Sequence, residues 1–261
     1  MKNIKINLET KADRITIIPI ADIHKGDRFC DMALFNKTIK RVLDEKDTYC
    51  VLNGDLINNA IKSSVSNSYE EVISPQKQLE WATEVLYPIR DKILCITSGN
   101  HENRTARESG IDITKVIAAQ LEIEDRFCSE SALIFISFGA MQKTKKAQRV
   151  QKMLYTLFVT HGSGGGRKAG GKVNGILDLS SIVDADVYIR SHTHTPFIIR
   201  QTFYRLDLRT KTSRPVDKLF VSTASYLDYG GYADRANYVP VSKKNPTIYL
   251  SNFKHEVYAV E

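Results

Sequence analysis

Apolar runs that end in polar turns are the feature that most constrains what this chain can fold into. The run at residues 93–96 is followed almost at once by Ser98-Gly99-Asn100-His101-Glu102. A short apolar run between helical patterns is typical of a buried strand. Gly99 permits a tight turn at the carboxyl end of this strand, so an amide, an imidazole and a carboxylate enter one crevice. A single turn of this kind is more often a solvated loop with a surface histidine, but the chain repeats it.

The pattern recurs through the first half of the chain. A β-branched run at residues 14–20 leads into Asp22 and His24, and the run at residues 49–52 leads into Asp55. Strands that alternate with helices of 10 to 16 residues favour βαβ units and a largely parallel sheet. Apolar residues at helical spacing, with capping residues at the starts, predict these helices at residues 31–46, 75–89 and 112–121.

The second half changes character. Strands are predicted at residues 132–138 and 153–159, and the basic loop at residues 139–152 between them suggests an antiparallel pair. The second of these strands leads into His161. The other predicted elements are an edge strand at residues 1–6, a short helix near residues 175–182 after a glycine-rich loop at 162–171, and strands at 186–189, 197–207, 218–225 and 247–250.

The composition is that of an ordinary soluble globular protein. A chain of 261 residues can bury a complete core, and we expect one domain over residues 1–261. No apolar run reaches the roughly 18 residues that cross a membrane, so no membrane partner is expected. Residues 1–6 lack the continuous apolar segment of a signal peptide. The four cysteines form no CxxC pair, which favours reduced thiols and a cytoplasmic location.

Eight potential ligand side chains follow the predicted strands, and five of the six histidines are among them. Because the carboxyl ends of parallel strands converge on one crevice, we expect these side chains to share a site. Imidazoles and carboxylates bind divalent ions, and the set is large enough for two ions that share one carboxylate. The set is Asp22, His24, Asp55, Asn100, His101, His161, His192 and His194.

Other kinds of site lack their motifs. The chain has no Gly-x-Ser-x-Gly elbow, no P-loop and no Gly-x-Gly-x-x-Gly after its first strand, so nucleophilic-serine, P-loop and dinucleotide sites lack support. No cysteine belongs to the set, which argues against a structural zinc cluster or an iron–sulfur centre.

In five motifs the chain resembles the calcineurin-like metallophosphoesterases, and the motifs occur in the family's order across residues 15–196. They are Asp22-Ile23-His24, Gly54-Asp55-Leu56-Ile57-Asn58, Gly99-Asn100-His101-Glu102, His161-Gly162 and His192-Thr193-His194. The resemblance implies an α/β fold, a four-layered αββα sandwich of two mixed sheets with the dimetal site at the strand carboxyl ends. One departure is Ser191, where the family usually has glycine, and it removes no ligand.

The resemblance also implies a role for each site residue. His101 would face the scissile phosphate and Glu102 would orient His101, while Asn58 would support its loop or be purely structural. The ions would be Mn²⁺, with Fe or Zn²⁺ as alternatives, and they would activate a hydroxide for phosphodiester hydrolysis. One ion would be held by Asp22, His24, Asp55 and His194, and the other by Asp55, Asn100, His161 and His192.

The charge distribution bears on the substrate. The net charge is +7, and residues 131–177 contain no acidic residue but eight lysines and arginines. This region is either a solvated hairpin or a track for a DNA or RNA backbone. Arg167 and Lys168, in the glycine-rich loop, either bind a substrate phosphate or belong to a mobile lid. Four tyrosines either stack on a base or cover a core edge, and they are Tyr226, Tyr229, Tyr232 and Tyr238.

Three classes of function therefore stay open at this point. The favoured activity is that of a DNA or RNA nuclease, similar to the small repair-exonuclease branch of the family. The alternative is a phosphodiesterase for small or cyclic nucleotides, or a protein phosphatase. A non-catalytic scaffold on the same fold is the remaining hypothesis, and the complete ligand set argues against it.

Overall fold

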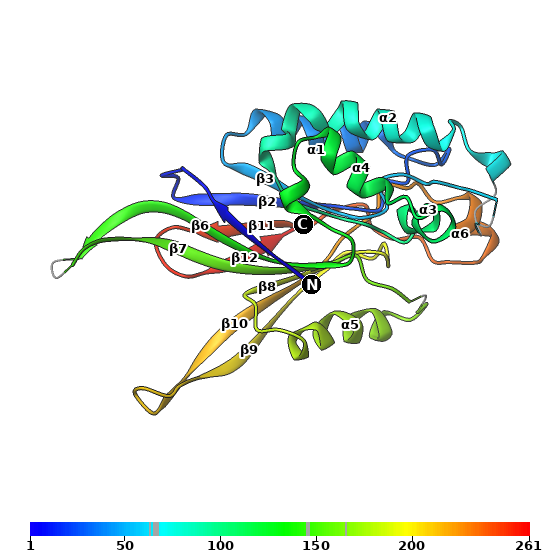
Figure 1. The fold of residues 1–261 in the computed structure, drawn as a ribbon. Coiled ribbons are helices and arrows are strands. Elements are labelled where there is room, and N and C mark those ends of the chain that lie inside the picture. Colours follow the sequence, from blue (N-terminus) through cyan, green and yellow to red (C-terminus); the bar gives the residue numbers. More distant parts are fainter. Residues whose placement is uncertain (63, 65–67, 145–146, 165) are drawn as a thin grey trace.

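Two mixed β-sheets lie face to face, with helices on their outer sides (Figure 1). The computed structural model describes residues 1–62, 64, 68–144, 147–164 and 166–261. Within this part of the chain each sheet has six strands. The arrangement confirms the predicted α/β fold of two mixed sheets.

The sheet that carries the first motifs has the strand order β12-β11-β2-β3-β4-β5. Strands β2 to β5 are parallel, whereas β11 pairs antiparallel with both β2 and β12. The strand run in the first half of the chain is therefore parallel, as predicted. The bounds are β2 (Arg14–Ile20), β3 (Thr48–Asn53), β4 (Ile93–Thr97), β5 (Phe127–Cys128), β11 (Thr247–Ser251) and β12 (Val257–Val260).

The other sheet has the order β1-β6-β7-β8-β10-β9. Strand β1 pairs parallel with β6 at one edge, which confirms the predicted edge strand. Strands β6 and β7 form the predicted antiparallel pair, and β8 pairs parallel with β7 and with β10. The bounds are β1 (Lys2–Asn7), β6 (Ser131–Thr144), β7 (Ala147–Thr160), β8 (Val187–Arg190), β9 (Phe197–Asp207) and β10 (Thr212–Ser222).

Helices α1, α2 and α4 begin at the capping residues that the sequence indicated. The side chains of Asp31, Ser74 and Asp112 each accept a bond from a backbone amide in the first turn of the helix that follows. The bounds are α1 (Met32–Asp44), α2 (Pro75–Leu86), α3 (Glu102–Ser109), α4 (Ile113–Gln120), α5 (Ala169–Leu177) and α6 (Gly231–Arg235).

Three apolar clusters separate the layers. One fills the space between the sheets, with residues such as Ile17, Val51 and Leu157. A second lies between the β2–β5 sheet and helices α1, α2 and α4, and a third lies between the other sheet and α5 (Figure 1). Packing on both faces explains why the central strands read as continuous apolar runs. No helix in the described ranges is both long and apolar enough to span a membrane.

Several predicted boundaries were wrong. Most of the loop expected at residues 139–152 is strand, because β6 continues to Thr144 and β7 begins at Ala147. Strand pairing uses backbone N–H and C=O groups, so a polar sequence can extend a hairpin that begins with an apolar one. Lys145 and Lys146 lie outside the described residues. Helix α5 begins at residue 169, earlier than expected, and β10 begins at residue 212.

Candidate metal centre

The loops after five strands meet at one edge of the sandwich. Loops after β2, β3 and β4 belong to one sheet, and loops after β7 and β8 to the other. The structure brings all eight predicted ligand candidates together there. In order of strand they are Asp22 and His24, Asp55, Asn100 and His101, His161, and finally His192 with His194.

Five of these eight residues have left-handed backbone conformations. Their φ angles are 54° for Asp22, 52° for His24, 52° for Asp55, 70° for His192 and 54° for His194. A non-glycine residue in this region costs about 1–3 kcal/mol, and such residues concentrate at functional sites. The local backbone is therefore strained at the residues that direct potential ligands into the crevice.

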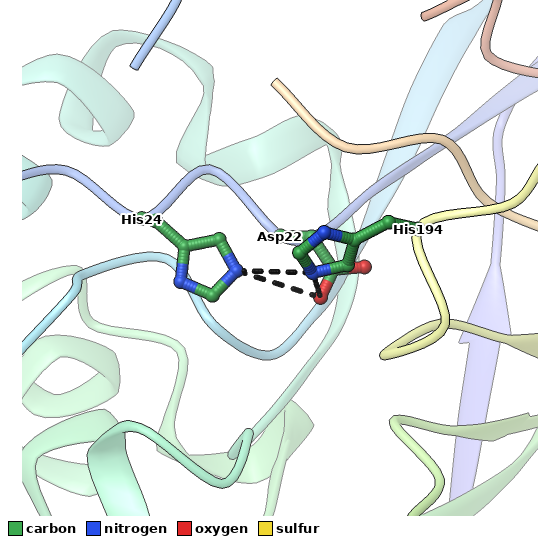
Figure 2. A group of neighbouring side chains, drawn as sticks. All are labelled: Asp22, His24 and His194. Atoms are coloured by element: carbon green, nitrogen blue, oxygen red, sulfur yellow. Dashed lines mark hydrogen bonds and ion pairs between the residues drawn. The ribbon is translucent and has the colours of Figure 1, made fainter. Parts of the chain in front are cut away.

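Asp22, His24 and His194 form the first group of potential metal ligands (Figure 2). His194 Nε2 lies 3.3 Å from Asp22 Oδ1 and 3.2 Å from His24 Nε2. Asp22 Oδ1 is buried and has no hydrogen-bond partner among the described residues. A buried carboxylate oxygen without a hydrogen bond, facing two imidazole nitrogens, fits a bound cation.

Asp55, His161 and His192 form the second group, and Asn100 adds an amide oxygen. His161 Nε2 lies 3.2 Å from Asp55 Oδ2 and 3.1 Å from Asn100 Oδ1. The same Asp55 oxygen is 3.9 Å from His24 Nε2 in the first group. Asp55 thus lies between two groups of donors, which fit two divalent ions that share its carboxylate.

The carboxylates and imidazoles of this centre shift one another's pKa values. Burial lowers the pKa of His161, but the Asp55 and Asp22 carboxylates and the Asn53 carbonyl together raise it to about 10. Burial raises the pKa of Asp55, but His161 and His101 hold it well below its ordinary value. A histidine must be neutral to bind a metal, so a metal ion would replace the proton on His161.

Glu102 holds the loops of the centre by their backbone. It is fully buried, and its two oxygens accept hydrogen bonds from the amides of Asp55, Leu56, Ile57 and Gly99 at 2.7–3.2 Å. We expected Glu102 to orient His101, but its hydrogen-bond partners among the described residues are these amides. The first residue of α3 therefore connects the loop after β3 to the loop after β4.

The His101 ring is oriented by two other residues. Its Nδ1 lies 2.7 Å from the backbone oxygen of Asn58, and its Nε2 lies 3.0 Å from Nη2 of Arg104. Because a carbonyl only accepts, Nδ1 carries the proton and Nε2 accepts from Arg104. Asn58, whose role the sequence left open, thus positions His101 through its backbone. His101 Nε2 is 3.9 Å from Asp55 Oδ2.

Asn53, which the sequence did not single out, connects the two sheets beside the centre. From the end of β3 its side chain donates to Thr160 O at 2.9 Å and to Ser191 Oγ at 2.7 Å. Its backbone oxygen lies 2.7 Å from His161 Nδ1. Ser191, the departure from the usual glycine, thus uses its hydroxyl to join β8 to β3. A polar residue that ends a buried strand was the available signal for Asn53.

The predicted substrate-binding residues lie on the glycine-rich segment after His161. Arg167 and Lys168 are both exposed, and the Arg167 guanidinium lies 5.1 Å from the centre of the Tyr238 ring. Tyr226 is buried in the core, whereas Tyr229 and Tyr232 are about half exposed, at 48% and 56%. The four tyrosines therefore differ in exposure, and Tyr226 belongs to the core.

The structure separates the basic hairpin from the centre. His161 follows the carboxyl end of β7, while Ala147 begins β7 at its other end, on the order of 40 Å away for 14 extended residues. Figure 1 shows this hairpin projecting from the far side of the molecule. Lys152 donates to Asn7 on β1 and Lys172 to Thr193 O, so these two cations have local partners.

The sequence of the chain matches one family of known proteins. The family model for calcineurin-like phosphoesterases matches residues 15–196, the range over which the motifs were found. No curated protein sequence matches the chain.

Among solved structures, similar ones include a predicted phosphoesterase from Streptococcus pneumoniae TIGR4, with 12% identity, a TM-score of 0.39 and coverage of 95% of this chain and 89% of that one. A metallophosphoesterase from Sphaerobacter thermophilus has 13% identity, a TM-score of 0.38 and coverage of 95% and 88%. A double mutant of Vps29 from Entamoeba histolytica has 9% identity, a TM-score of 0.37 and coverage of 95% and 98%.

Proposed function

The chain belongs to the calcineurin-like phosphoesterase family, and from this premise we propose that it hydrolyses phosphodiester bonds, with DNA or RNA as the favoured substrate. One observation carries the proposal. Asp55 lies between two groups of potential metal ligands, and His101 Nε2 lies 3.9 Å from its carboxylate. Two cations and a nearby imidazole are what an in-line attack on a phosphate ester requires.

The donor groups suggest how the ions are held. Bound divalent ions would supply a hydroxide near neutral pH and neutralise the non-bridging phosphate oxygens. Mn²⁺ is our first choice for these mixed ligands, with Fe or Zn²⁺ as alternatives. Asp22, His24, Asp55 and His194 would hold one ion, and Asp55, Asn100, His161 and His192 would hold the other.

The residues around the ions perform the remaining tasks. Asn58 and Arg104 fix the tautomer of His101, so that its Nε2 edge is directed to the substrate. Glu102 and Asn53 keep the ligand loops at their separation through backbone hydrogen bonds. A site held this rigidly has little reorganisation to undergo during reaction.

The nucleic-acid substrate is supported by exposed cations and aromatic rings on two segments of the chain. Arg167 and Lys168 are exposed six and seven residues after His161, and the exposed rings of Tyr229 and Tyr232 offer flat surfaces to a base. The distant basic hairpin lends little to this argument. A small or cyclic nucleotide, or a phosphoprotein, would use the same metal chemistry without extended backbone contacts.

A panel of substrates tests the proposal. With Mn²⁺ added, we expect cleavage of bis-p-nitrophenyl phosphate and of labelled DNA, and loss of both activities in His101→Ala and Asp55→Ala. Cleavage of DNA should fall steeply between about 50 and 200 mM salt if several phosphates are bound. Cleavage of p-nitrophenyl phosphate or a small nucleotide alone would replace the nuclease by the alternative. No hydrolysis with Mn²⁺, Fe or Zn²⁺ would support the hypothesis of a non-catalytic scaffold.

A further inference from the structure

Arg104 lies at the centre, and orienting His101 is the one role assigned to it so far. It is on α3, one turn after His101, and its guanidinium makes two contacts within this site. Nη2 lies 3.0 Å from His101 Nε2, and Nη1 lies 3.2 Å from the backbone oxygen of Asn58. Both partners are neutral, and a guanidinium has five N–H donors, so most of its capacity is unused by them.

The charge of Arg104 is not neutralised by a close partner. Among the described residues no carboxylate oxygen lies within ion-pair distance, 4.0 Å, of its guanidinium. The side chain is partly buried, and this burial lowers its pKa although Asp55, Glu102 and Glu71 attract the charge from further away. A half-buried arginine that serves only the fold would be expected to end on a carboxylate. The planar fork with spare donors suits a phosphate, which offers two oxygens at matching separation.

We propose that Arg104 is a further catalytic residue, whose guanidinium binds non-bridging oxygens of the substrate phosphate; this rests on the proposed phosphoesterase function. Any phosphate oxygen that contacts His101 Nε2 must take the position that the Arg104 N–H now occupies, 3.0 Å from that nitrogen. The guanidinium then moves its donor from the ring to the phosphate. The exchange frees Nε2 to take up a proton from solvent and donate a hydrogen bond to the same phosphate, while Asn58 continues to accept from Nδ1.

Phosphate binding tests this role without requiring turnover. Inorganic phosphate is titrated calorimetrically into the Mn²⁺-loaded protein and into the variants Arg104→Ala, Arg104→Lys and Arg107→Ala. Arg107 is exposed on the same helix and serves as the matched control. We expect Arg104→Ala to weaken phosphate binding about tenfold or more, Arg104→Lys to recover part of the affinity, and Arg107→Ala to bind like wild type. Metal content should be the same in all four proteins.

A second comparison separates direct binding from the orientation of His101. In a His101→Ala background, Arg104→Ala should still weaken phosphate binding, because the guanidinium contacts the anion itself. No further loss in that background would overturn the proposal and leave Arg104 as a positioning residue. Wild-type affinity in Arg104→Ala, or no phosphate binding by wild type, would overturn it as well.

Folding defects would not hide the answer. If Arg104→Ala fails to fold or to load metal, Arg104→Lys is compared with Arg104→Gln, which has a long polar side chain without the charge. Equal phosphate affinity in these two variants would contradict the proposal. The test is also separate from that of the proposed function, since a protein that cleaves no ester could still bind phosphate through Arg104.

Discussion

At the scale of single residues, Glu102 shows how one carboxylate can define a metal centre that it does not enter. All four of its hydrogen-bond partners are backbone amides, two for each oxygen. Burial, followed by the nearby Asp55 charge, raises the pKa of Glu102 to about 7, while these amides stabilise its charged form. Only a side chain with two acceptor atoms can satisfy this set of donors.

We expect Glu102→Gln to lower the free energy of unfolding by about 1–3 kcal/mol and to weaken metal binding. The new NH₂ group would face two amide donors in a buried site and leave them without an acceptor. Urea denaturation of the metal-free protein and a Mn²⁺ titration measure the two effects. Glu84→Gln, an exposed change on α2, is the control and should leave both unchanged. Wild-type values in Glu102→Gln would contradict this account of the loops.

At the scale of elements, α3 is a helix that the apolar pattern of the sequence does not predict. Residues 102–109 have no apolar periodicity, because the buried side chain of this helix is Glu102 itself. The sequence therefore predicted neither the helix nor the position of Arg104. Helices α1, α2 and α4, which each pack an apolar face on the core, were predicted from that face. The length of the β6–β7 hairpin was missed for the converse reason, since backbone pairing continues where the apolar pattern stops.

The end of β3 is the element that joins the sheets at the metal centre. Asn53 is fully buried, donates to Thr160 and Ser191, and accepts from Thr97 Oγ1 at 2.8 Å. We expect Asn53→Ala to lower the free energy of unfolding by about 1–3 kcal/mol, because buried polar partners lose their bonds. Urea denaturation is the measurement, with the exposed Asn174→Ala on α5 as control. Equal effects of the two changes would show that this connection is dispensable.

At the scale of the whole molecule, the two sheets are also connected at the end opposite the centre. His255, between β11 and β12, stacks on Tyr155 of β7 and lies 3.5 Å from Asp186, which precedes β8. The Tyr155 hydroxyl donates to backbone oxygens of the same loop, including Ser251 O at 2.6 Å. The sandwich is therefore fixed at both ends of its strands.

This second connection predicts a pH dependence of stability. The hydrogen bond to Asp186 raises the pKa of His255 above its ordinary 6.5, so its contribution is complete below that pH and is lost as pH rises through the raised pKa. Burial raises the pKa of Asp186, but His255 and Thr156 bring it below the ordinary 3.8, so its contribution is lost in acid. The contact stabilises most between these two values.

The variant His255→Gln isolates this contact. We expect it to lose more stability relative to wild type at about pH 5.5 than at about pH 8.5, because only the charged imidazole is attracted to Asp186. Urea denaturation of both proteins at each pH gives the difference, and other titrating groups cancel in the comparison. The same loss at both pH values would contradict the assigned charge.

The general plan of the molecule follows from its strands. Each apolar run that ends in Asp, Asn or His became a strand whose carboxyl end lies at the shared edge, so the eight candidate ligands could be grouped from sequence. The features that bring these side chains close enough to share metal ions could not be predicted from the sequence. These features are the left-handed backbone at five of the ligand candidates and the hydrogen bonds made by Asn53 and Glu102. Both depend on packing between distant segments.

The central claim is that Asp55 is shared by two cations. Anomalous diffraction from crystals loaded with Mn²⁺ tests it most directly. We predict two peaks about 3.5–4 Å apart with the Asp55 carboxylate between them. The first peak should lie beside Asp22, His24 and His194, and the second beside Asn100, His161 and His192. A single peak, or two peaks without Asp55 between them, would contradict the account.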